Sequence, residues 1–171
     1  MKLFKYFFIL AISVSLIACT SDDDAPAYEL NSTNLSAASY QVNYLVTNAT
    51  GTVIIEGIQV EVSDENSIGE FFNLTYNFSE NETYRYDGEY LNNTTRILAD
   101  GTVLEDSSII TVIDNETGTY AANNSTMQLL LGETLYDVTL FNTNELRLSS
   151  SDAYTEDGID YVETSEIRMV R

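Results

Sequence analysis

The chain has 171 residues, of which 44% are hydrophobic, and it carries a formal net charge of -20 with no histidine and a single cysteine. This length fits one domain plus a targeting segment, and a surface this acidic repels nucleic-acid phosphates and anionic lipid headgroups. The composition also excludes a disulfide framework, a conventional zinc or transition-metal site and a histidine-dependent catalytic relay.

Residues 1–18 have the layout of a secretory signal peptide. Lys2 and Lys5 precede an apolar run over residues 6–18, which is shorter than the roughly 20 residues of a membrane-spanning helix. The run ends in Leu16-Ile17-Ala18-Cys19, which resembles the bacterial lipobox. The resemblance implies that the leader is cut before Cys19, that Cys19 is lipidated and that the lipid attaches the protein to a membrane.

Residues 19–39 form the predicted lipidated cysteine and an acidic, flexible tether, because residues 20–39 are polar and lack periodicity. The Ser-Asp-Asp-Asp behind Cys19 resembles lipoproteins of Bacteroidetes, notably flavobacteria, in which acidic residues there are associated with export to the cell surface. A plain solvated linker is the alternative. We therefore expect a lipid-anchored protein of the outer membrane, with the periplasmic face and the cell surface both left open.

Residues 40–171 form the predicted domain, in which short strands alternate with turn signals. "FNLTYNF" (72–78) and "YRYDGEY" (84–90) each place apolar side chains on one face and polar ones on the other, as half-buried antiparallel strands do. The two apolar faces must coincide, which predicts three cross-strand pairs around loop 79–83. These pairs are Phe78 with Tyr84, Tyr76 with Tyr86, and Phe72 with Tyr90.

Three further turns are predicted in the C-terminal third. Gly132-Glu133 suits a type II′ turn that pairs Leu131 with Thr134, Leu129 with Tyr136 and Met127 with Val138. Asn142-Thr143-Asn144 is expected to join strands in which Leu140 faces Leu146 and Val138 faces Leu148. Glu156-Asp157-Gly158 leads into the last strand.

Other predicted strands cover residues 40–47, 52–63, 95–104, 108–113 and 117–121. A long series of antiparallel strands joined by tight hairpins usually closes, because closure removes exposed edges. The sequence therefore predicts an all-β, antiparallel up-and-down meander that closes into a β-barrel of about 8–10 strands.

The stretch "NETGTYAANNSTMQLLLGETLYDVTLFNTNELRLSSS" (115–151) resembles the later half of lipocalin-like lipoproteins from Bacteroidetes. "LTYNFSENETYRYDGEY" (74–90) resembles the middle segment of that family. The residues matching the family's later motifs are Gly118, Thr119, Tyr120, Met127, Leu129, Leu140, Glu145, Leu146 and Leu148. The resemblance implies a lipocalin-like barrel, although the first strand lacks the family's Gly-x-Trp.

The candidate ligand-lining residues are aromatic side chains on one face of the predicted sheet: Phe72, Tyr76, Tyr84, Tyr86, Tyr90 and Tyr136. They would line a barrel cavity for an apolar ligand, or simply pack as core with hydroxyls at the rim. The one metal worth considering is calcium, whose weak candidate ligands are Asp152, Glu156, Asp157 and Asp160, although a plain turn explains them better.

Two functions follow from these expectations. The first is an envelope binding module that holds a small apolar molecule or a glycan fragment in its barrel. The second is a structural or partner-binding surface lipoprotein whose barrel is filled by side chains. No cofactor and no catalytic residue are predicted, since a carboxylate pair is better explained by the acidic surface, and no nucleic-acid partner is expected.

Overall fold

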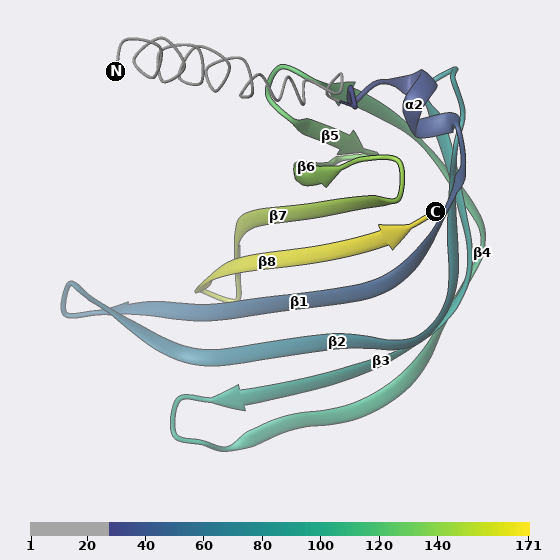
Figure 1. Cartoon of the computed structure of the whole chain (residues 1–171). Coiled ribbons are helices and arrows are strands. Elements are labelled where there is room, and N and C mark those ends of the chain that lie inside the picture. The colour runs from purple at the N-terminus through teal and green to yellow at the C-terminus, as the bar shows by residue number, and fades with distance from the viewer. Residues whose placement is uncertain (1–27) are drawn as a thin grey trace, which may run out of the picture.

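A computed structural model describes residues 28–171, and most of them belong to one antiparallel sheet. Eight strands run up and down in chain order and β8 pairs with β1, so the sheet closes into a barrel (Figure 1). This confirms the predicted meander. The elements are α2 (Ser32–Ser36), β1 (Ser39–Ile55), β2 (Ile58–Phe78), β3 (Thr83–Leu98), β4 (Val103–Asn123), β5 (Gln128–Leu131), β6 (Thr134–Phe141), β7 (Glu145–Glu156) and β8 (Ile159–Val170).

The strands are longer than predicted in the first two thirds of the domain. β1 continues through residues 48–51, where the sequence predicted a break, and the predicted strand 52–63 is wrong because the turn at Glu56-Gly57, both with positive φ, divides it between β1 and β2. The predicted strand 95–104 is divided by the turn between β3 and β4, whereas 108–113 and 117–121 belong to one strand, β4. β-bulges in these strands shift the side-chain alternation, and this conceals their continuity in the sequence.

The register of the aromatic hairpin agrees with the sequence at two of its three predicted pairs. Phe78 lies opposite Tyr84 and Tyr76 opposite Tyr86. Phe72 falls in a register shift between Glu70 and Asn73, so it has no direct Cα partner, but its ring still stacks on that of Tyr90 at 5.8 Å between centroids. Phe72 therefore remains on the same face as Tyr90, as predicted, despite the β-bulge.

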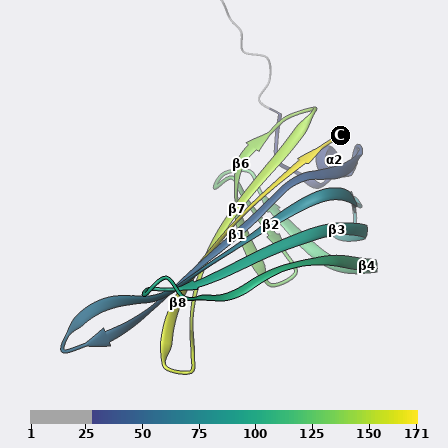
Figure 2. The same ribbon diagram turned by 90° about the horizontal axis from the view of Figure 1, so that it is seen from below.

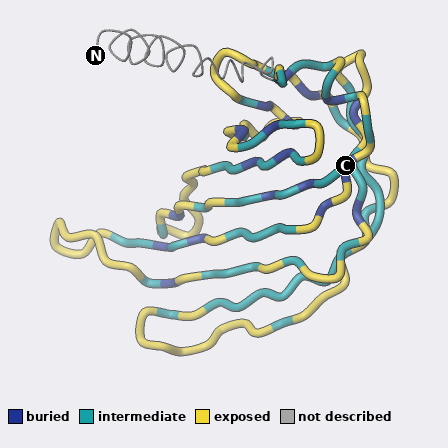
Figure 3. The backbone as a smooth tube through the Cα atoms, viewed as in Figure 1, coloured by how far each residue is buried: buried dark blue, intermediate teal, exposed yellow. Residues whose placement is uncertain are grey.

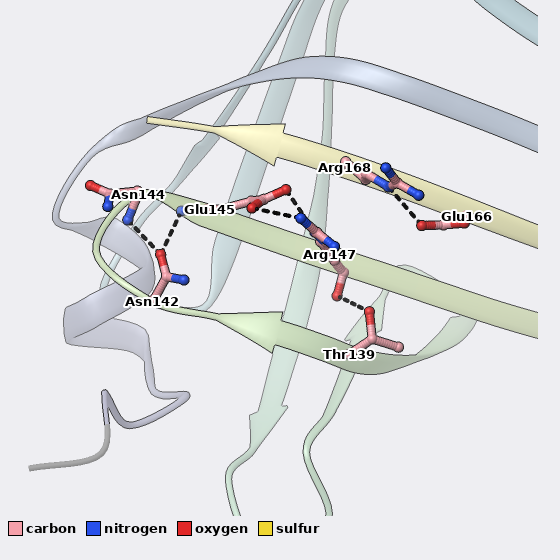
Figure 4. Close-up of polar contacts among 7 residues, drawn as sticks. All are labelled: Thr139, Asn142, Asn144, Glu145, Arg147, Glu166 and Arg168. Carbon is pink, nitrogen blue, oxygen red and sulfur yellow. Dashed lines mark hydrogen bonds and ion pairs between the residues drawn. The ribbon is translucent and has the colours of Figure 1, made fainter. Parts of the chain in front are cut away.

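The C-terminal hairpins also agree with the predicted register at some pairs and depart from it at others. Leu131 pairs with Thr134 across Gly132, whose φ is 60°, as predicted. The pairing of Leu140 with Leu146 is wrong: Phe141 lies opposite Leu146, because the register shifts between Val138 and Leu140. The turn itself is built by the side chain of Asn142, which accepts the backbone N–H groups of residues 144 and 145 (Figure 4).

The buried core gathers at one end of the barrel, which we call the closed end (Figure 3). Helix α2 lies at this end, where Asn31 caps it by accepting the N–H of Asn34 at 2.8 Å and where Leu35 is fully buried. Leu30 is also buried, so the predicted tether 19–39 is wrong for its last part, since these apolar side chains pack into the domain. The predicted leader, Cys19 and the rest of the tether lie outside the described residues.

The other end, which we call the open end, carries the hairpin turns 55–58, 98–103 and 156–159 (Figure 2). β4 pairs along its length with β3 but only over residues 120–123 with β5, which has 4 residues. The ring is therefore complete only near the closed end. Toward the open end, β1 to β4, β7 and β8 continue as a curved sheet.

Candidate binding site inside the barrel

All six predicted lining residues come together on the inner face, and they pack against one another. The Tyr76 ring stacks on Tyr86 at 4.8 Å between centroids and on Tyr84 at 6.2 Å. Tyr136 lies opposite Leu129 of the core, while Phe72 and Tyr90 form their own stack. All six adjoin the buried cluster as half-buried side chains. The stripe is therefore an aromatic packing layer above the core.

The electrostatics of the stripe agree with this packing. Burial raises the pKa of Tyr76 far above its ordinary value, and the neighbouring hydroxyls of Tyr86 and Tyr136 raise it further. Burial also raises the pKa of Tyr86, whose hydroxyl donates a hydrogen bond to the Glu116 carboxylate. These hydroxyls stay protonated at neutral pH, so the layer is uncharged.

Toward the open end the inner face becomes polar. β3 continues the alternation of Tyr84, Tyr86 and Tyr90 into Asn92, Thr94 and Arg96, and their neighbours on β2 include Ser67 and Glu65. Ser67 and Thr94 share a hydrogen bond of 2.9 Å between their hydroxyls, and Arg96 Nε contacts a Glu65 carboxylate oxygen at 2.8 Å. We call this surface the polar inner wall.

A hollow of about 230 Å³ lies beside the polar inner wall, lined by Val62, Ser63, Arg96, Leu98, Leu104, Ile159 and Tyr161. Ser63 is 6% exposed and its hydroxyl has no hydrogen-bond partner, which is costly for a buried polar group. The Tyr161 ring is also buried and stacks on Tyr154 at 5.1 Å. The hollow thus combines an unpartnered hydroxyl, a guanidinium and an aromatic ring.

Gly51 of β1 shapes this hollow. A Cβ at this position would lie 2.5 Å from the Ser63 hydroxyl and 2.8 Å from a Tyr161 ring carbon, both closer than packing allows. The glycine therefore lets the serine and the ring approach each other across the β1 backbone. Arg96 carries five N–H donors, and its contact through Nε uses only one of them. The hollow can accept one small ligand that has both hydroxyls and an apolar face.

Two larger hollows lie on the outer face of the barrel. One, of about 410 Å³, is lined mainly by side chains such as Asn48, Asp137, Ser149 and Thr164, and the other, of about 600 Å³, by Asn77, Arg85 and Thr117 among others. Both contain outward-pointing polar residues of the strands. We favour the smaller hollow as a site because it alone of the three includes the unpartnered buried hydroxyl.

The other four arginines of the described residues are engaged in local contacts. Arg147 and Arg168 pair with Glu145 and Glu166 on the outer face, each at 2.7 Å (Figure 4). Arg171 donates to the hydroxyls of Tyr28 and Tyr40 and to the Asn34 carbonyl, and so fastens the N-terminal segment over the closed end. Arg85 contacts Asp87 at 3.9 Å. Such an arrangement does not favour a highly anionic ligand.

The four predicted calcium ligands are spread along a hairpin. Asp152 lies opposite Glu163, Asp160 accepts a hydrogen bond from the Thr155 hydroxyl, and Glu156 and Asp157 lie at the turn. Within residues 28–171, no group of three or more acidic or cysteine side chains is arranged to hold a metal ion. The turn explanation accounts for these acids.

No protein-family model, curated protein or solved structure matches the chain. Within the part of the chain that the structure describes, no helix has both the length and the apolar character that crossing a membrane requires.

The sequence did not identify Ser63, Arg96 and Tyr161 as site residues. One signal was present: Arg96 has the same parity as Tyr84, Tyr86 and Tyr90, so a continuous β3 places it on their face. The predicted break before residue 95 concealed this relation.

Proposed function

We propose that this protein is a lipid-anchored envelope lipoprotein, lipocalin-like in design, whose barrel binds a small glycan fragment at its open end. The observation that carries the binding proposal is the buried, unpartnered hydroxyl of Ser63 beside Arg96 and Tyr161. Ligand hydroxyls would complete its hydrogen bonding and occupy the free donors of the guanidinium. The lipid is proposed on Cys19, from the lipobox resemblance of residues 16–19.

The arrangement favours a sugar over a purely apolar ligand. The apolar part of the interior is already occupied by stacked rings at the closed end. An apolar ligand at the open end would leave the Ser63 hydroxyl without a hydrogen-bond partner, at a cost of about 1–3 kcal/mol, and would desolvate the Arg96–Glu65 ion pair without satisfying the remaining donors of the guanidinium. A sugar ring offers hydroxyls for these groups and a C–H face for Tyr161.

The entry point of the chain supports a particular orientation. Tyr28 packs on Phe141 at 4.9 Å between ring centroids, at the closed end, opposite the hairpin turns (Figure 1). An anchor at Cys19 would hold this end toward the membrane, so the open end would face away from it. This orientation suits capture of a ligand at the outer membrane, on its periplasmic face or at the cell surface. Because the net charge of -20 gives no electrostatic attraction to anionic lipid headgroups, the lipid proposed on Cys19 would supply the membrane attachment.

Nuclear magnetic resonance tests the binding proposal. Residues 20–171, which contain every element of the barrel, would be titrated with maltotriose, cellotriose, chitotriose and decanoate while the amide signals are recorded. We expect one oligosaccharide to shift the signals of Ser63, Arg96 and Tyr161. The variant Arg96→Gln should lose this response, whereas Arg85→Gln, with its arginine on the outer face, should keep it.

Two results would contradict the proposal. Decanoate that shifts Tyr76 and Tyr86 while the sugars shift nothing would indicate an apolar ligand within the aromatic layer. A lack of response to every probe would favour the second function, a structural or partner-binding lipoprotein with a side-chain-filled barrel. The packed tyrosines agree with a side-chain-filled barrel, as the second function requires, but they fill it only at the closed end.

A further inference from the structure

β4 has a free edge over most of its length. Its residues pair with β3 from Val103 to Thr119, but on the other side β5 reaches only residues 120–123. The backbone hydrogen bond from Gly132 to the Thr119 carbonyl is the last contact toward β5. Residues 103–118 therefore have no strand beside them on that side within the described chain. An edge of this kind is a template for another strand.

The ladder shows which backbone groups are free. The N–H of Tyr120 donates to the Glu82 carbonyl. The backbone N–H and C=O groups of the even-numbered residues in β3 are therefore directed toward β4, whereas their side chains lie on the inner face. Tyr90, Asn92 and Thr94 then bond Thr111, Ile109 and Ser107 respectively, because bonded positions alternate along an antiparallel pair. The intervening residues of β4, among them Ser108, Ile110 and Val112, direct their N–H and C=O groups to the free side.

The centre of this edge favours strand addition. Residues 107–113 read Ser-Ser-Ile-Ile-Thr-Val-Ile, with high β-propensity, no charge and no proline. Ile109, Ile110 and Val112 are 60%, 65% and 69% exposed. Natural edges are usually protected by lysine or proline, and neither occurs here. By contrast, the free edge of β7 beyond β6, Ser-Ser-Asp-Ala-Tyr-Thr-Glu (150–156), is polar.

Acidic residues flank this centre on both sides: Glu105 and Asp106 precede it, and Asp114 and Glu116 follow it. A second copy pairing antiparallel about Ile110 would set Asp106 opposite the other copy's Asp114, and like charges in that arrangement are destabilising. Each copy also carries a net charge of -20, which opposes self-association. The flanks are complementary to cationic residues.

We propose that the free edge of β4 binds an extended segment of a partner protein by β-strand addition. The segment has a β-branched apolar centre that pairs with residues 107–113 and basic residues that face the acidic flanks. Main-chain hydrogen bonds supply affinity in this mode of recognition, and the flanking charges supply selectivity. This inference does not rest on the sugar site, which faces the interior.

The test uses residues 20–171 and a synthetic peptide in which threonine alternates with isoleucine and valine between lysines at both ends. We expect calorimetric binding that weakens as salt is raised and slowed amide exchange at Ser108, Ile110 and Val112. Ile110→Pro removes an edge-facing N–H without touching the β3 ladder, and it should weaken binding by about tenfold or more. Ala153→Pro, on the free edge of β7, is the matched control and should leave the affinity unchanged.

A charge exchange keeps the proposal testable should the proline variant unfold. Asp106→Lys combined with Asp114→Lys should transfer preference to the same peptide with glutamates in place of its lysines. Equal affinity of the original protein for both peptides would overturn the proposal. So would a concentration-dependent dimer in sedimentation with slowed exchange at residues 107–113, because the occupant would then be a second copy. Protection of these amides in the free monomer would identify residues 20–27 as the occupant and would also overturn it.

Discussion

Replacing Tyr76 by phenylalanine distinguishes a filled barrel from an open one. The Tyr76 ring lies in the centre of the aromatic layer, and burial raises the pKa of its hydroxyl far above the ordinary value of about 10. Below pH 10 this tyrosine is neutral in both folded and unfolded chains. The loss of the hydroxyl should therefore change the free energy of unfolding by less than about 1 kcal/mol at neutral pH.

Above pH 10 the two proteins should diverge. The unfolded chain loses the Tyr76 proton and the folded protein keeps it, so the free energy of unfolding of the original protein falls as pH rises. The slope from this one group is about 1.4 kcal/mol per pH unit until the folded pKa is reached. Phenylalanine lacks this proton, so at about pH 11 the variant should gain about 1.4 kcal/mol relative to the original protein.

Urea unfolding followed by far-ultraviolet circular dichroism at about pH 7 and about pH 11 measures this difference. The neutral measurement is the internal reference, since it contains every effect of the substitution except the titration. An unchanged difference between the two pH values would refute the reasoning. Tyr76 would then titrate as a solvated phenol, the closed end would hold an open cavity, and the stripe would be available to line a ligand.

Three further predictions concern other parts of the chain. Arg171→Met should lower the free energy of unfolding, measured in urea, by about 2–4 kcal/mol, because it removes charged hydrogen bonds to Tyr28, Tyr40 and Asn34. The control Arg85→Met, at an exposed arginine, should lower it by less than about 0.5 kcal/mol. An equally small loss for Arg171→Met would contradict the role of Arg171 in fastening the N-terminal segment over the closed end. Gly88→Ala should cost more than about 3 kcal/mol, since its φ is 131° and a Cβ would meet the Asn73 carbonyl oxygen at 1.8 Å, while Gly57→Ala, at a φ of 80° in open space, should cost about 1 kcal/mol. Cys19→Ala should leave the full-length protein uncleaved or free of lipid, as measured by mass spectrometry and fatty-acid labelling in cells, and a wild-type protein that is soluble, cleaved elsewhere and unlipidated would disprove the anchor.

Short-range features of the fold were predictable from the sequence. The aromatic hairpin and the Gly132 turn follow from alternation over a few residues and from a turn that fixes the register, so Tyr76–Tyr86 and Leu131–Thr134 were placed correctly. Errors arose where bulges interrupt the period of two. The shift between Val138 and Leu140 moves Phe141 opposite Leu146, and no local signal in the sequence marks it.

The candidate site was predictable only in part. The aromatic stripe was predictable from the alternation of apolar and polar residues, because its side chains are apolar and half-buried. The hollow at the open end requires β2, β3 and β8 to meet, and these contacts join residues as distant as Ser63, Arg96 and Tyr161. Their side chains belong to a polar inner wall, so they leave no hydrophobic pattern by which a sequence could identify their face.

The unequal length of the strands accounts for both proposed sites. β2 and β4 have 21 residues each, but β5 has 4 and β6 has 8, so the ring can close only where all eight strands overlap. Where they overlap, the buried core side chains and the stacked tyrosines pack against one another in the interior. Beyond that point, the inner wall is reached by solvent and tolerates serine, glutamate and arginine, while β4 lacks a neighbour. Extending β5 and β6 would therefore cover the free edge and close the open end together.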